Sequence, residues 1–102
     1  MSRPLAMVLG AALVAWSCAA GAADPANGKK VADGSCAACH GRNGIGIVAL
    51  YPNLAGQKME YLAAQLRAFR DGTRKNPIMS PMAAHLTDTD IEDVSAYLSL
   101  LR

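Results

Sequence analysis

Residues 36–40 read Cys36-Ala37-Ala38-Cys39-His40, and this pentapeptide decides what the rest of the chain is built around. Two cysteines three positions apart lie on one face of a helical turn, so both thiols can add to the vinyl groups along one edge of a porphyrin. The histidine that follows can then supply the proximal ligand of the iron. The spacing therefore predicts one covalently attached haem c, held through Cys36 and Cys39 and ligated by His40.

Other chemistries use only part of this motif. A zinc site would need two further ligands elsewhere in the chain. A thiol–disulfide oxidoreductase needs only the C-x-x-C portion, but it occurs within a thioredoxin-like βαβ pattern, which the helical periodicities of this chain do not support. Redox-active thiols without haem colour would identify that alternative.

The N-terminal segment, residues 1–23, is predicted to be a cleaved secretory signal peptide. A single charge at Arg3 precedes an uncharged apolar run over residues 5–16, and small residues then lead up to Asp24. This order of a short charged region, an apolar region and a small-residue cleavage zone is typical of export signals. We place the cleavage after Ala23, which predicts a periplasmic protein that comprises residues 24–102.

Alternatives for this segment stay open. Cleavage could follow Ala20 or Ala22 instead. An uncleaved anchor is a further interpretation, because residues 5–23 carry no charge and 19 residues is about the minimum for a membrane span. Lipidation at Cys18 is the third. Contact with a membrane is expected only under the last two interpretations. Removal of Cys18 with the signal would leave the two haem cysteines and no odd thiol.

The size and charge of residues 24–102 limit what they can do. A chain this short forms one domain and seldom buries enough apolar surface to fold stably without a cross-link or a bound cofactor. A covalent haem would supply that stabilisation. We therefore expect the haem-free chain to fold poorly. The formal net charge of the full sequence is +2, which argues against a nucleic-acid partner.

Basic and acidic residues are distributed unevenly. The bases precede the last predicted helix: Lys29, Lys30, Arg42, Lys58, Arg67, Arg70, Arg74 and Lys75. Four of the eight acids lie on that helix: Asp88, Asp90, Glu92 and Asp93. This is either an ordinary solvated surface, with acids favouring a helix N-terminus, or a charge dipole that orients a redox partner.

Three main helices are expected, and no strand. The first begins at Asp24-Pro25, with an N-cap acid and a proline at the first helical position, and runs through Val31 towards the haem motif with Gly34 as a mild interruption. The second covers residues 58–70, where Leu62, Leu66 and Phe69 form an apolar face, and stops at Asp71-Gly72.

The third helix begins at Thr87-Asp88-Thr89-Asp90, which resembles a capping box with Asp in place of Glu. Its apolar stripe comprises Ile91, Val94, Leu98 and Leu101. Residues 41–57 are glycine-rich at their start and are predicted to be loop, including the apolar run 47–50. Residues 73–84, with Pro77 and Pro81, are also predicted to be loop. Such long loops suggest that something fills the middle of an all-α domain.

A six-coordinate electron-transfer haem needs a second axial ligand, and methionine opposite histidine raises the reduction potential. The candidates downstream of His40 are Met59, Met79, Met82 and His85. Met59 opens a regular helix, where methionine usually packs, and His85 would give bis-histidine ligation. Position alone does not separate Met79 from Met82.

Several further stretches complete a family pattern: Tyr51-Pro52-Asn53-Leu54-Ala55-Gly56-Gln57, Tyr61-Leu62 with Gln65-Leu66, Met79-Ser80-Pro81-Met82, and Leu86-Thr87-Asp88 through Ala96-Tyr97-Leu98. Together with Cys36-Ala37-Ala38-Cys39-His40-Gly41, they make residues 25–102 resemble the class I cytochromes c. The likeness is to the small monohaem bacterial type and to one haem domain of the periplasmic dihaem cytochromes. It implies the small class I cytochrome c fold, with helices and long loops wrapped around one haem.

The resemblance also implies residue roles. Met79, the first methionine of the pair, is the implied sixth ligand, with Met82 packing nearby. The carbonyl of Pro52 would accept the N–H of His40 and increase the basicity of the ring. Leu54 would lie against the haem. The dihaem relatives have two such domains and this chain has one, so any partner haem would belong to another protein.

A second implied contact concerns the helices: Gly28 and Tyr97 would mark the close approach of the first and last helices, where a side chain at position 28 would block packing.

The resemblance implies a one-electron carrier rather than an enzyme. It would be either mobile or the cytochrome subunit of a dehydrogenase, as a monomer or within a complex. The expected partners are redox proteins: a dehydrogenase, a quinol-oxidising complex or a terminal oxidase. The alternative is an open-site haem enzyme or gas-binding protein, peroxidase-like, in which Arg74 or His85 serves the distal side.

Overall fold

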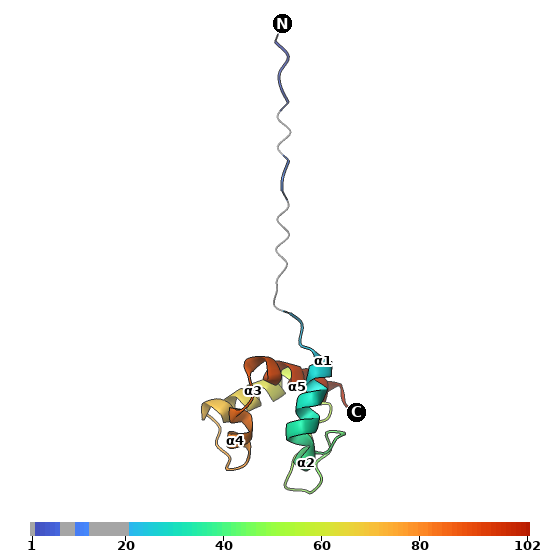
Figure 1. The fold of residues 1–102 in the computed structure, drawn as a ribbon, viewed down its shortest axis with the longest axis vertical. Helices are drawn as coiled ribbons and strands as arrows, with labels where there is room; N and C mark the ends of the chain where they lie inside the picture. Colours follow the sequence, from blue (N-terminus) through green and yellow to red (C-terminus); the bar gives the residue numbers. More distant parts are fainter. Residues whose placement is uncertain (1, 7–9, 13–20) are drawn as a thin grey trace.

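The computed structural model describes residues 2–6, 10–12 and 21–102, and its helices gather in one domain (Figure 1). The helical elements in chain order are α1 Pro25–Val31, η1 Ala32–Cys36, α2 Ala37–His40, α3 Met59–Asp71, α4 Met79–Ala84 and α5 Asp88–Leu100. No strand occurs within the described residues, in agreement with the predicted all-α class. Within the same residues, no helix has both the length and the apolar character needed to cross a membrane.

The first helical run carries the chain directly into the haem motif. The side chain of Asp24 accepts the N–H of Ala26 at 2.9 Å, and Pro25 occupies the first turn, as the sequence predicted. After α1 the chain does not break at Gly34 but widens into the π-helical segment η1, from which α2 continues to His40. Such π-helical turns occur frequently at functional sites.

The helices α1 and α5 cross in close contact. A Cβ atom built at Gly28 would lie 1.9 Å from the backbone oxygen of Asp93 and 2.8 Å from the Cβ of Tyr97. No side chain fits into that space, so glycine is required for the two helices to approach. The structure thus contains the close contact that the resemblance implied at Gly28 and Tyr97.

The small apolar core lies between α1, η1, α3 and α5. Its centre consists of Ala32, Leu62, Val94 and Leu98, with Cys36, Leu54 and Leu66 among the half-buried residues packed against it. The predicted apolar stripes of α3 and α5 therefore face the core. The capping box at the start of α5 has both of its hydrogen bonds, between Thr87 and Asp90, and α3 ends at Gly72 as predicted.

One predicted loop is wrong. Residues 79–84 form α4, although Pro77 and Pro81 suggested an irregular segment. Pro81 falls in the first turn of α4, where a backbone N–H has no partner within the helix, so its missing N–H costs nothing there. The side chain of Asn76 accepts the backbone N–H groups of Ile78 and Met79, both at 2.9 Å, and starts the helix. The loop predicted over residues 41–57 is confirmed.

The charged residues of α3 and α5 face one another. Arg67 pairs with Glu92, and Arg70 Nη2 lies 2.7 Å from an Asp88 carboxylate oxygen. The carboxylate of Asp88, followed by that of Asp71, raises the pKa of Arg70. These pairs neutralise some of the basic and acidic residues that the sequence places apart, and as exposed ion pairs they add little stability.

Candidate haem-binding site

The two motif cysteines lie on consecutive turns at the end of the first helical run. Cys36 closes η1 and Cys39 lies in α2; both are half-buried, and among the residues that the structure describes neither forms a disulfide. Cys36 also packs against the apolar core, so one attachment point is part of the folded interior rather than of a mobile loop. A group bonded to this thiol is thereby joined to the core.

Burial raises the pKa of the Cys36 thiol to about 11. A thiol–disulfide oxidoreductase requires the opposite shift, because the thiolate is its reactive form and must be populated near neutral pH. A thioether has no thiol to ionise, so burial of its sulfur carries no such penalty. The chemistry of this position fits covalent attachment and disfavours the oxidoreductase alternative.

His40 is held in a defined orientation. Its side chain is 7 % exposed, and Nδ1 lies 2.8 Å from the carbonyl oxygen of Pro52. A carbonyl can only accept, so a neutral ring in this contact carries its proton on Nδ1 and keeps the lone pair on Nε2. The imidazole is thus presented in the tautomer that a metal ligand needs, and the hydrogen bond fixes the orientation of the ring.

The loop after α2 folds back to bring Pro52 to His40. The Gly44 carbonyl accepts the N–H groups of Leu54 at 2.7 Å and Ala55 at 3.0 Å. At the other end, Ile47 donates its N–H to the Cys39 carbonyl at 3.1 Å. These bonds fasten the segment that contains Pro52 to the end of α2, so the orientation of His40 is fixed by the backbone of its own loop.

Gly46 and Tyr51 complete this loop. A Cβ at Gly46 would lie 1.8 Å from the carbonyl oxygen of Tyr51, so the turn closes only with glycine at that position. The Tyr51 ring lies 6.3 Å from the His40 ring, centroid to centroid, at an interplanar angle of 55°. Sequence reasoning recognised a loop here but assigned no role to either residue. The glycines between Cys39 and Pro52 were the available indication, because a short loop that returns to the haem motif needs residues that permit tight turns.

The candidate sixth ligands lie on α4. In Figure 1, α2 and α4 lie at the same end of the domain, well separated, with α3 and α5 above them. Met79 and Met82 are three positions apart and so lie on one side of α4, where Met79 is half-buried and Met82 is 41 % exposed. The ligand is therefore expected from a short helix, not from the irregular loop that the prolines suggested.

The residues considered for an open distal site are placed differently. The Arg74 guanidinium lies 4.5 Å from the centroid of the Phe69 ring, and its Nη1 donates to Gln65 Oε1 at 2.7 Å. His85 is exposed at the C-terminal end of α4. Arg74 is thus engaged with α3, and neither side chain has contacts of the kind that a defined distal acid–base group needs.

The residues of this region fit a haem. Large apolar side chains remain exposed on the loop after α2 and around α4: Ile45, Ile47, Val48, Leu50, Ile78 and Met82. Exposed apolar surface on this scale in a small domain marks a place that another group covers. The donors nearby are an oriented imidazole, two thiols at the attachment spacing and two thioether sulfurs, the set that a covalent haem uses.

The comparisons with known proteins agree with this chemistry. The family model described as cytochrome c matches residues 25–102. Cytochrome c-554(548) of Halomonas halodenitrificans is 49 % identical over 69 residues, which cover 65 % of this chain and 83 % of that relative. A thiosulfate dehydrogenase electron acceptor of Stutzerimonas stutzeri is 45 % identical over 67 residues, covering 63 % of this chain and 31 % of the relative.

Among solved structures, the cytochrome c4 of Acidithiobacillus ferrooxidans superposes with a TM-score of 0.72 at 35 % identity, covering 83 % of this chain and 54 % of that one. This chain therefore spans about half or less of the cytochrome c4 and the thiosulfate dehydrogenase electron acceptor, but most of the cytochrome c-554(548). The chain belongs to the cytochrome c family: it has the class I fold, and its Cys36 and Cys39 fit the attachment motif for the covalent haem c of an electron carrier.

Proposed function

We propose that this protein is a periplasmic one-electron carrier whose haem iron is ligated by His40 and Met79. The contact that carries the proposal is the 2.8 Å hydrogen bond between His40 Nδ1 and the Pro52 carbonyl. It holds the ring in one tautomer in both oxidation states. A haem held here would supply the one-electron chemistry. Because the protein holds His40 and Met79 in place, little rearrangement of these residues would accompany electron transfer.

Each residue of the site has a defined task in this proposal. Cys36 and Cys39 hold the haem, which supplies the one-electron chemistry when bound. His40 ligates the iron, Pro52 fixes His40, and Leu54, half-buried against the core, offers an apolar contact to the ring.

Met79 is favoured over Met82 by its surroundings. Its backbone N–H is bound by the Asn76 side chain at 2.9 Å, so the start of α4 is anchored at this residue. Met79 is also half-buried, whereas Met82 is 41 % exposed. A ligand that must stay bound through many redox cycles benefits from an anchored backbone, because less conformational freedom is then lost on binding.

The periplasmic location rests on the signal-like segment over residues 1–23. The partner is proposed to be a redox protein that docks over the haem edge near Cys36 and Cys39. One relative is named a thiosulfate dehydrogenase electron acceptor, which supports a dehydrogenase of sulfur compounds as the electron donor. A quinol-oxidising complex or a terminal oxidase would occupy the other end of the transfer. Stable co-purification with a dehydrogenase subunit would show that the cytochrome is a subunit rather than a mobile carrier.

Optical spectra of the exported holoprotein test the ligation. The wild-type ferric protein should show the weak long-wavelength charge-transfer band of sulfur-bound haem, and the reduced protein the sharp bands of low-spin haem c. Met79→Ala should keep the haem but lose that band, bind carbon monoxide when reduced, and lower the midpoint potential by an appreciable part of the ~0.8 V range that axial ligands span. Met82→Ala is the matched control and should retain the band; the reverse pattern would reassign the ligand.

A further inference from the structure

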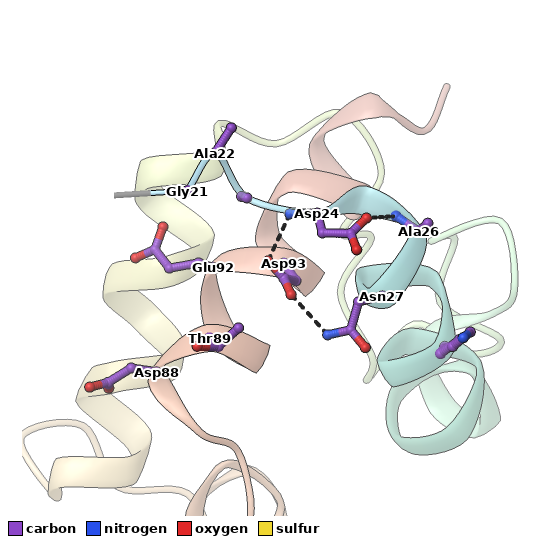
Figure 2. A pocket seen from close by; sticks show the side chains of 11 residues that line it. Gly21, Ala22, Asp24, Ala26, Asn27, Asp88, Thr89, Glu92 and Asp93 are labelled. Atoms are coloured by element: carbon purple, nitrogen blue, oxygen red, sulfur yellow. Dashed lines mark hydrogen bonds between the residues drawn. The ribbon is translucent and has the colours of Figure 1, made fainter. Parts of the chain in front are cut away.

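A buried carboxylate without a cation partner lies where α1 crosses α5. Asp93 is only 5 % exposed. Its two oxygens accept the backbone N–H of Asp24 and the side-chain amide of Asn27, each at 2.8 Å (Figure 2). Both donors are neutral, whereas a buried carboxylate is stabilised best by a positively charged group that also donates hydrogen bonds.

The neighbouring charges do not supply that group. Two other acids line the same groove on α5, and each is bound to an arginine of α3: Asp88 to Arg70, and Glu92 to Arg67. Lys30 of α1 also lines the groove but is exposed and forms no ion pair with Asp93. Within residues 21–102, Asp93 is thus the buried acid of this groove that no lysine, arginine or histidine reaches.

The donor to Asp93 has an unusual place in the sequence. Asp24 directly follows the proposed cleavage point after Ala23. Hydrolysis of the Ala23–Asp24 peptide bond consumes one water, leaves a carboxylate on Ala23, and converts the Asp24 backbone nitrogen into an α-amino group. That group takes up a proton near neutral pH, since its ordinary pKa is about 7.7–8.0.

We infer that Asp93 is the binding site for the α-ammonium group of the processed chain, so that removal of the signal peptide replaces a neutral hydrogen bond with a buried ion pair. The inference rests on the proposed export of the protein. Asp24 Oδ1 already accepts the Ala26 N–H at 2.9 Å, so the helix start is formed before processing. Processing adds a positive charge and two further N–H donors at the Asp24 nitrogen.

The ion pair lies at the close crossing of α1 and α5. The Asp93 backbone oxygen is the atom that Gly28 approaches most closely, so the carboxylate and the helix contact belong to one residue. A positive charge at the N-terminus of α1 is unfavourable in the helix dipole. The carboxylates of Asp24 and Asp93 offset this unfavourable interaction with the dipole, and α1 is bound to α5 at its N-cap residue, Asp24.

The first experiment determines the N-terminus of the exported haem protein by intact mass and N-terminal sequencing. A chain that begins at Asp24 is expected. A chain that begins at Gly21 or Ala23 would leave Asp24 N as an amide, and would overturn the inference while export stands. A chain that retains Met1 would overturn both the inference and the proposed export.

The second experiment is a double-mutant cycle on the holoprotein. One change inserts Gly-Ser directly before Asp24, so that the exported chain begins two residues earlier, which the mass confirms; the other is Asp93→Asn. Each single change should lower the folding equilibrium constant, measured by urea denaturation at pH 6, about tenfold or more. The insertion should have no further effect once Asp93→Asn is present. Fully additive effects would overturn the inference.

The third measurement determines the pKa of the N-terminal amine. Trace acetylation of the N-terminal amine against pH, followed by mass spectrometry of the N-terminal peptide, should give a pKa above about 8 in the wild type. The stabilisation should be complete at pH 6, where the amine is protonated and Asp93 is ionised, and lost as the pH rises through that value. Asp93→Asn should return the pKa to its ordinary range, whereas Glu92→Gln, which removes the same charge from a groove residue bound to Arg67, should change it much less. An ordinary pKa in the wild type would overturn the inference.

Discussion

The two ends of this domain differ in how their apolar side chains are covered. At the crossing of α1 and α5, protein atoms cover the apolar residues: Gly28, Val94 and Leu98 are buried, and there is no room for a Cβ atom at Gly28. At the end that carries α2 and α4, apolar side chains such as Ile47 and Leu50 remain exposed at 61 % and 76 %. The first end is completed by protein, and we propose that the second is completed by the haem.

This difference explains how so short a chain can form a cytochrome. Its own core has only Ala32, Leu62, Val94 and Leu98 at the centre, too little for a robust domain of this length. Cys36 packs against that core and fits the haem attachment motif, so it links the two ends. Three sets of substitutions would break or sharpen the comparison.

The largest effect is expected at the open end. His40→Ala removes the oriented imidazole and leaves the Pro52 carbonyl without its donor, so no stable low-spin holoprotein should accumulate. Haem staining and visible spectra of the exported protein measure the loss. His85→Ala is the matched control, because that histidine is exposed at the end of α4 and its removal should leave the spectrum unchanged. A normal low-spin spectrum in His40→Ala would contradict the assigned ligand.

An intermediate effect is expected at the closed end. Gly28→Ala places a Cβ 1.9 Å from the backbone oxygen of Asp93 and forces α1 away from α5. Urea denaturation of the ferric holoprotein should show a loss of about 3 kcal/mol, with the spectrum unchanged in the folded state.

Gly34→Ala serves as the control for that substitution. A Cβ there meets nothing within 4 Å, and the residue is helical, so a gain of about 0.5–1 kcal/mol is expected. Equal losses at both positions would show that the helix crossing is not what makes Gly28 necessary.

The smallest effect is expected where a side chain only caps a helix. Thr87→Ala removes the hydroxyl that accepts the Asp90 N–H at 3.0 Å, and should cost about 1 kcal/mol in the same denaturation experiment. Thr89→Ala changes the same residue type two positions later, outside the capping box, and should have a smaller effect. If both cost the same, the box adds nothing beyond helix propensity.

Local signals in the sequence were sufficient wherever neighbouring residues settle the structure. The start of α1 at Asp24, the stop of α3 at Gly72 and the capping box of α5 were all predicted, because each depends on hydrogen bonds within a few residues. The apolar stripes were predicted for the same reason, since helical period alone assigns residues to one face.

Prediction failed where the outcome depended on distant partners or on position within a turn. The prolines of residues 77–81 suggested a loop, but Pro81 falls in the first turn of α4, where it is tolerated, and Asn76 starts the helix. Asp93 was grouped with the surface acids of α5. Asp93 is buried because the start of α1 packs against it, and its partner Asp24 lies 69 residues earlier in the chain. No local pattern within α5 reveals that contact.

The sequence by itself determined the cofactor chemistry, the family and every main helix except the short α4, because attachment spacing, capping residues and helical period are all local. Only the tertiary structure decided that Asp93 is buried against Asp24 and Asn27. The family resemblance implied the contacts of Gly28 with α5 and of His40 with Pro52, and the structure contains both. These features join segments that are distant in the chain. They arise from how the helices pack, which a one-dimensional pattern does not encode.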